Sequence, residues 1–84
     1  MIPLITLTAS EKSAIIEQLA SRLYSRKPSA QITTDVADIY VQGYCTELGF
    51  EITTTECIND DSEVVDIVES DLEYIEREVA KKIA

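Results

Sequence analysis

Five apolar residues near the end of the chain recur at alternating spacings of three and four, and this pattern limits the fold more than any other feature. Such spacing places side chains on one face of an α-helix. Lys81 and Lys82 follow it, where cations complement the helix dipole. The sequence therefore predicts a long helix over residues 62–83. The five apolar residues are Val65, Val68, Leu72, Ile75 and Val79.

A second helix is predicted near the start of the chain. Thr8 and Glu11 have the spacing of a capping box, in which the side chain of each residue accepts the backbone N–H of the other. Apolar residues at helical spacing follow, and Pro28 stops the helix because proline lacks the backbone N–H. These signals indicate a helix over residues 9–26.

A third helix is predicted over residues 35–48, from apolar and aromatic side chains at helical spacing. Gly43 lies in its middle, at a cost of about 1 kcal/mol relative to alanine, which indicates close packing against another backbone. The side chains expected to face inward are Val36, Ile39, Tyr40, Tyr44 and Leu48.

The segment EITTTECINDDSE, residues 51–63, leaves strand and helix open because it contains two possible helix starts. One has Thr53 as the N-cap and the other has Asp60. Four poor helix formers, residues 59–62, favour the second. Residues 50–57 are then a short strand or a turn of helix.

The predicted fold class is mainly α, a compact three-helix domain formed by residues 1–84 as a single unit. Residues 2–7 and 50–57 are rich in β-branched side chains, so the sequence allows a minor two-stranded pairing between them.

Charge is distributed unevenly along the chain. Sixteen acidic residues oppose seven basic ones, which gives a net charge of −9. Residues 28–76 contain thirteen of the acids and no lysine or arginine. Direct binding to nucleic acid or to an anionic membrane is disfavoured, because phosphate contacts need lysine and arginine. A basic protein partner is favoured instead.

The candidate partner-binding surface is acidic. Four acids at spacings of three and four form one ribbon along the last predicted helix, and three more lie at its start. These residues are Asp60, Asp61, Glu63, Asp66, Glu69, Glu73 and Glu76. The hypothesis is a decoy that occupies the basic surface of a nucleic-acid-binding protein, as small acidic inhibitors from phages and mobile elements do. The alternative for the ribbon is a solvated face that keeps the protein soluble.

A different class of function remains open. Ile67 and Tyr74 lie off the apolar face of the last predicted helix, one heptad apart, and are expected to be exposed. Exposed apolar residues of this kind supply dimer interfaces. The alternative is therefore an assembly subunit that forms homo-oligomers through this helix.

The residue types needed for most catalytic and metal sites are missing from the sequence. There is no histidine, and the two glycines cannot build a phosphate-binding loop. The oxygen-rich residues 59–63 lack the glycine of a calcium loop. We expect no enzyme activity, cofactor or metal. Cys45 and Cys57 are expected to be reduced thiols, and the lack of a leader or a long apolar run predicts a cytoplasmic protein.

Overall fold

The computed structural model describes residues 2–83 and shows an α+β fold with two helices and a five-stranded sheet. The expected three-helix domain is therefore wrong. In chain order the elements are β1 (Leu4–Ile5), α1 (Ala9–Ser21), β2 (Ser29–Thr33), β3 (Ala37–Thr46), β4 (Gly49–Asn59), β5 (Val64–Ile67) and α2 (Glu69–Ile83).

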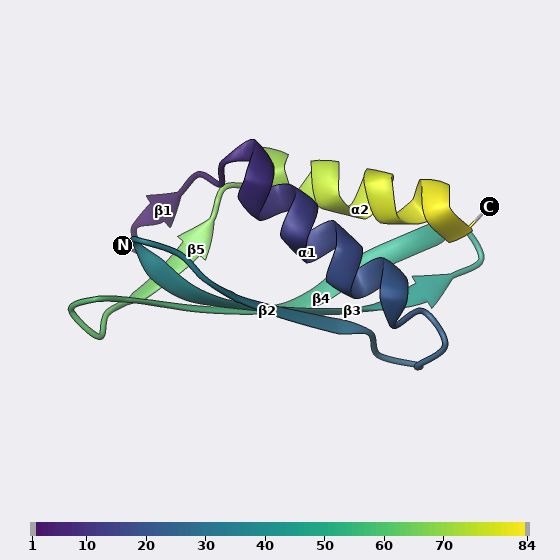
Figure 1. The fold of residues 1–84 in the computed structure, drawn as a ribbon, viewed down its shortest axis with the longest axis horizontal. Coiled ribbons are helices and arrows are strands. Elements are labelled where there is room, and N and C mark those ends of the chain that lie inside the picture. The colour runs from purple at the N-terminus through teal and green to yellow at the C-terminus, as the bar shows by residue number, and fades with distance from the viewer. Residues whose placement is uncertain (1, 84) are drawn as a thin grey trace.

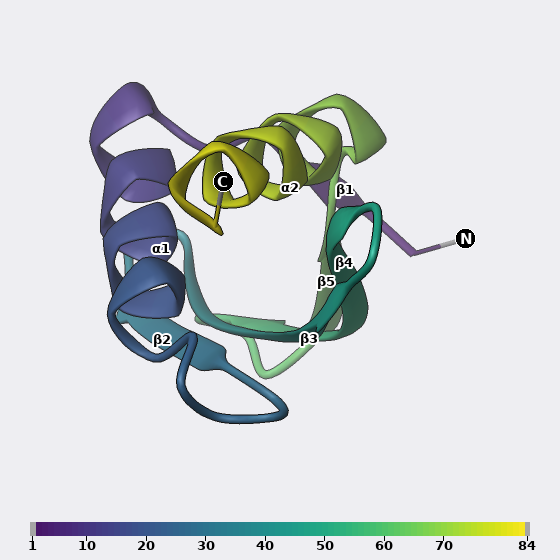
Figure 2. The ribbon, with the colours of Figure 1, turned by 90° about the vertical axis from the view of Figure 1, so that its right-hand side faces the viewer.

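The strands lie in the order β1-β5-β4-β3-β2. Neighbouring strands are antiparallel except β1 and β5, which are parallel. Helix α1 carries the chain from β1 at one edge to β2 at the other. Both helices lie on the same face of the sheet, and no helix of residues 2–83 covers the opposite face (Figures 1 and 2).

The core fills the space between the two helices and the sheet. Helix α1 contributes Ile15 and Leu19, which have no exposed surface, and α2 contributes Ile75 and Val79, also at 0%. The sheet meets them with alternate residues of its strands, because successive side chains of a strand point to opposite faces. These buried strand residues include Ala30, Ile39, Val41, Phe50, Cys57, Val65 and Ile67.

The capping box at the start of α1 is confirmed. The Glu11 N–H donates to Thr8 Oγ1 at 3.2 Å, and the Thr8 N–H donates to Glu11 Oε1 at 2.9 Å. The helix is shorter than predicted and ends at Ser21. Arg22 is the C-cap residue and lies outside the helix. Its side chain donates to the Ser29 carbonyl at 2.8 Å and so ties the end of α1 to β2.

The predicted helix over 35–48 is wrong, because this segment forms β3. Its residues also alternate, and the alternation decides the structure because β2 and β4 pair with β3 on its two sides, whereas the helices bury one of its faces. Three residues expected to face inward are exposed, at 53% for Val36, 40% for Tyr44 and 100% for Leu48.

Gly43 is closely packed, as the sequence predicts, although it lies in a strand. It adjoins an irregularity in the pairing of β3 with β4. A Cβ atom at this position would overlap the Glu51 carbonyl oxygen and lie 2.6 Å from the Phe50 ring. This irregularity in the strand pairing therefore needs a residue without a side chain.

The predicted helix over 62–83 is wrong in its first part and confirmed in its second. Val65 belongs to the apolar pattern but lies in β5, and α2 begins at Glu69. The chain cannot start a helix at Asp60, because Asn59 holds residues 59–63 as a turn that joins β4 to β5. Its Oδ1 accepts the N–H groups of Asp61 and Glu63 at 3.0 and 2.9 Å.

Residues 50–57 form a strand, and β4 extends beyond them at both ends. The predicted pairing of this segment with residues 2–7 is wrong. Strand β1 pairs with β5, with Leu4 opposite Asp66 and Ile5 opposite Ile67. Strand β5 thus lies between β1 and β4.

Helix α1 also closes the β2 edge of the sheet. The Gln18 side chain accepts the Gln31 N–H at 2.9 Å and donates to the Gln31 carbonyl at 3.0 Å. Unpaired backbone groups at a sheet edge attract further strands, and this amide occupies two of them.

Gly43→Ala is expected to lower the free energy of unfolding by about 2–3 kcal/mol or more, because the new methyl group must displace backbone as well as a ring. Gln42→Ala, at the neighbouring position, is the control and should cost less than about 1 kcal/mol. Urea denaturation measures both values. Equal stabilities for the two variants would contradict the close packing described at Gly43.

The two thiols are free, as expected, and differ in environment. Cys45 is exposed, whereas Cys57 is 1% exposed in the core. Burial, with a smaller contribution from the Asp66 charge, raises the pKa of Cys57 to about 11. A protonated, buried thiol is a poor nucleophile.

We therefore expect a thiol reagent such as DTNB, applied near pH 8, to modify one cysteine per folded chain and a second after denaturation. Cys45→Ser should remove the fast reaction. Two thiols that react at the same rate in the folded protein would show that Cys57 is not enclosed.

Candidate interaction surface

The sheet carries no positive side chains. Within residues 2–83, no strand and no turn between two strands contains lysine or arginine. The base-free stretch of the sequence, residues 28–76, thus corresponds to β2–β5 and the beginning of α2. Most of this stretch therefore lies in the sheet, and residues 69–76 lie in the helix layer.

Acidic residues gather at one end of the sheet. The β2–β3 turn and the β4–β5 turn meet there, because Ala37 at the start of β3 pairs with Asn59 at the end of β4 (Figure 1). Five exposed acids lie at this end, namely Asp35, Asp38, Asp60, Asp61 and Glu63.

Most of the bases lie at the opposite end. The α1–β2 loop, the β3–β4 turn and the last turn of α2 are at that end (Figure 1), and Gly49 of the turn adjoins Ala80 of α2. The molecule is 39 Å long and 22 Å across. Its charge is therefore polarised along the long axis. The bases at this end are Arg22, Arg26, Lys27, Lys81 and Lys82.

Three predicted partner-binding residues, Asp60, Asp61 and Glu63, are exposed in the β4–β5 turn. Asn59 fixes the backbone of this turn, and Ser62 adopts a positive φ of 62°. The turn therefore presents three carboxylates to solvent from a defined backbone.

The four-acid ribbon predicted on one helix does not exist as a unit. Asp66 lies in β5, half-buried, and its Oδ1 accepts the Thr55 hydroxyl at 3.3 Å and the Ile67 N–H at 2.8 Å. Glu76 Oε2 accepts the Ile52 N–H of β4 at 2.8 Å. Glu69 and Glu73 remain exposed on α2.

The predicted oligomer interface is also not available as a pair. Ile67 faces the core and is 2% exposed, because it lies in β5 rather than on a helix. Tyr74 is 39% exposed, and the Lys12 ammonium lies 4.8 Å from its ring centroid. The two residues therefore do not form one exposed surface.

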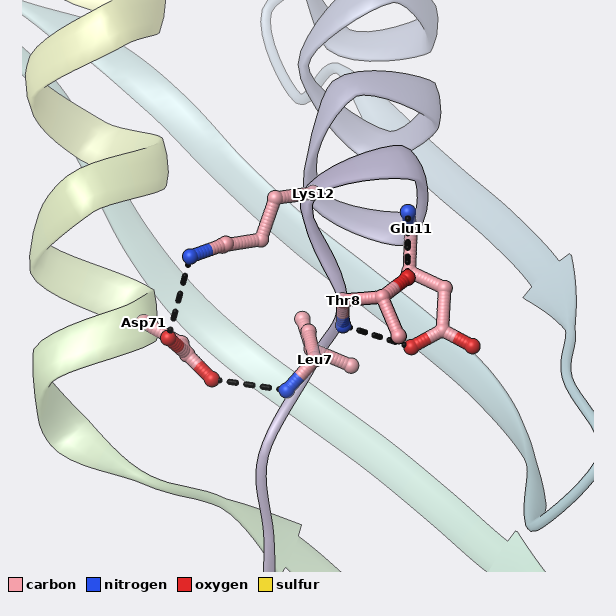
Figure 3. A network of polar contacts seen from close by, with 5 residues as sticks. All are labelled: Leu7, Thr8, Glu11, Lys12 and Asp71. Atoms are coloured by element: carbon pink, nitrogen blue, oxygen red, sulfur yellow. Dashed lines mark hydrogen bonds and ion pairs between the residues drawn. The ribbon is translucent and has the colours of Figure 1, made fainter.

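A network that the sequence does not predict joins α1, α2 and the segment before α1 (Figure 3). Asp71, only 9% exposed, accepts the Leu7 N–H at 2.8 Å through Oδ2. Its other oxygen lies 3.6 Å from Lys12 Nζ. Asp71 thus satisfies a buried N–H and a cation, which is a structural role.

Sequence reasoning missed three acids of the surface, Asp35, Asp38 and Glu56. The first two lie in the predicted helix over 35–48, and Glu56 lies in the segment 50–57, which the sequence leaves as strand or helix. The alternation of apolar and polar residues over 37–42 was the signal that could have placed Asp38 on an open sheet face.

No metal or membrane-spanning element is found among residues 2–83. No group of three histidine, cysteine or acidic side chains there could hold a metal ion. No helix there is long and apolar enough to cross a membrane.

Comparisons with known proteins return no relative of this chain. No family model, no curated protein and no solved structure matches it. The surface itself must therefore support any functional proposal.

Replacing Asp71 tests the network that anchors α2. We expect Asp71→Ala to lower the free energy of unfolding by about 2–4 kcal/mol, because the Leu7 N–H and the Lys12 ammonium lose their partner. Asp71→Asn keeps an acceptor for the N–H and should cost less. Glu73→Ala, on the exposed side of α2, is the control, with an effect within about 0.5 kcal/mol. If Asp71→Ala is as stable as the control, the network does not contribute to the stability of the fold.

Proposed function

We propose that this chain is a non-enzymatic binding protein whose acidic sheet surface occupies a lysine- and arginine-rich surface of another protein. The observation that carries the proposal is the absence of bases from all strands and strand–strand turns among residues 2–83. Mixed charges suffice for solubility, and like charges repel one another in a folded chain. A segregated acidic layer therefore favours a role in recognition.

Basic protein surfaces of this kind commonly hold nucleic acid. An acidic protein that covers one competes with the nucleic acid for the same lysines and arginines, so we propose a decoy or inhibitor. The chain's own lack of bases on this layer disfavours direct nucleic-acid binding. A cytoplasmic location fits this proposal.

The exposed turn acids are expected to control this binding through their position as well as their charge. Asp35, Asp60 and Asp61, changed together to lysine, should weaken binding about tenfold or more, because they lie at the acidic end of the sheet. The helix control changes Glu17, Glu69 and Glu73 to lysine. Each set adds six charges, taking the net charge from −9 to −3.

The measurement is capture of heparin-binding proteins from a cell lysate on the immobilised chain, at low and high salt, with duplex DNA as competitor. Capture that falls with salt, yields to DNA and is lost in the sheet variant but kept in the helix control supports the proposal. Equal losses of capture in the two variants would show that net charge alone, and not the position of the acids, determines binding. Capture that survives the sheet variant would contradict the proposal.

A further inference from the structure

The helix-free face of the sheet carries an exposed apolar patch beside the acidic end. Ile58 of β4 lies directly opposite Val64 of β5, and their neighbours Cys57 and Val65 face the core. Both therefore point away from the helices, with 48% and 61% of their surface exposed. Leu4 of β1 is 63% exposed and points the same way, because Ile5 packs against the core.

A shallow depression of about 210 Å³ adjoins this patch. Tyr40 of β3 lies opposite Gln31 of β2 and Glu56 of β4, and Asp38 lies opposite Ile58. The two rows of side chains form its walls, so an aromatic ring, an isoleucine and two carboxylates meet at one hollow. The residues that line it are Gln31, Asp38, Ile39, Tyr40, Glu56 and Ile58.

The two carboxylates of the depression have no cation partner in the described part of the chain. The ion pairs within residues 2–83 join Lys12 to Asp71 and Lys81 to Glu78. A guanidinium group offers several N–H donors to carboxylates and stacks on an aromatic ring, whereas its aliphatic stem packs on apolar side chains. The depression therefore has the chemistry that receives an arginine.

We propose that this face is the docking site of the basic partner, with an arginine of the partner in the depression beside Tyr40 and apolar side chains on Leu4, Ile58 and Val64. This inference rests on the proposed function and names the kind of surface it recognises. Interfaces often place apolar anchors at the centre and charges at the rim. Here the rim is acidic, which calls for a basic partner.

Charge complementarity also decides against the other occupants of the face. In a symmetric dimer the same patch meets itself, which would bring Asp38 and Glu56 against the same acids of a second copy. Nucleic acid would bring phosphates against these carboxylates. A partner surface with arginine beside apolar residues meets neither obstacle.

The probe is a five-residue peptide of alternating leucine and arginine with blocked ends, titrated into the ¹⁵N-labelled full chain. Expected chemical-shift changes concentrate at Asp38, Tyr40, Glu56, Ile58 and Val64. A peptide with alanine in place of leucine keeps the charge and removes most of the apolar surface. It should bind about tenfold more weakly.

Variants separate this inference from the proposed function. Ile58→Thr and Val64→Thr replace exposed residues by another β-branched residue, so the strands are kept, and each should weaken the leucine–arginine peptide severalfold. Leu48→Ser is the control, because Leu48 is fully exposed in the β3–β4 turn at the other end of the molecule. It should leave the affinity unchanged.

Three outcomes overturn the docking site. If both peptides bind equally and shift the turn residues Asp60, Asp61 and Glu63, the docking site is wrong and the proposed function stands. If neither peptide binds the unchanged chain more strongly than it binds the variant with Asp35, Asp60 and Asp61 changed to lysine, the docking site and the proposed function both fail. If the mass of the free chain rises with its own concentration and Ile58→Thr prevents this, a second copy occupies the face.

Discussion

Both helices of residues 2–83 cover the same face of the five-stranded sheet, and the composition of the open face depends on this arrangement. Each strand must bury alternate side chains against α1 and α2, and the residues between them then face solvent. Ile39 and Val41 are therefore in the core, whereas Asp38 and Tyr40 are on the open face. The acids of β3 and β4 are displayed together because the core fixes the register of the strands.

The acidic residues divide into two groups by what they contact. Glu11, Asp71 and Glu76 each accept a backbone N–H, from Thr8, Leu7 and Ile52. The Thr8 bond is the cap of α1. Leu7 follows the short β1, and Ile52 lies in β4 beyond its short pairing with β5, so carboxylates of α2 satisfy these two N–H groups. The exposed acids of the turns make no such contacts through their carboxylates within residues 2–83, and the proposed function concerns these acids.

The start of α1 and the presence of α2 could be predicted from the sequence, whereas the sheet could not. The capping box of Thr8 and the spacing of Leu72, Ile75 and Val79 act within one helix and are sufficient by themselves. Residues 35–48 fit both a helical and an alternating pattern, and only pairing with β2 and β4 decides between them.

The candidate site could likewise be predicted only in part from the sequence. Asp60, Asp61 and Glu63 were predicted as surface acids and are exposed, although in a turn rather than at a helix start. Asp66 and Glu76 are used within the fold. Asp38 and Glu56 could not be placed on one face, diagonally across β3 and β4, without the register of these strands, because they lie far apart in the sequence.

The central claim is that negative potential is concentrated on the open sheet face and its turns and not on the helices. Paramagnetic relaxation by a small cationic nitroxide, compared with a neutral one of similar size, maps this potential directly along the labelled chain. The account predicts the largest ratio of cationic to neutral effects at residues 35–38 and 56–63. A uniform ratio, or a maximum at Glu69 and Glu73 of α2, would contradict it.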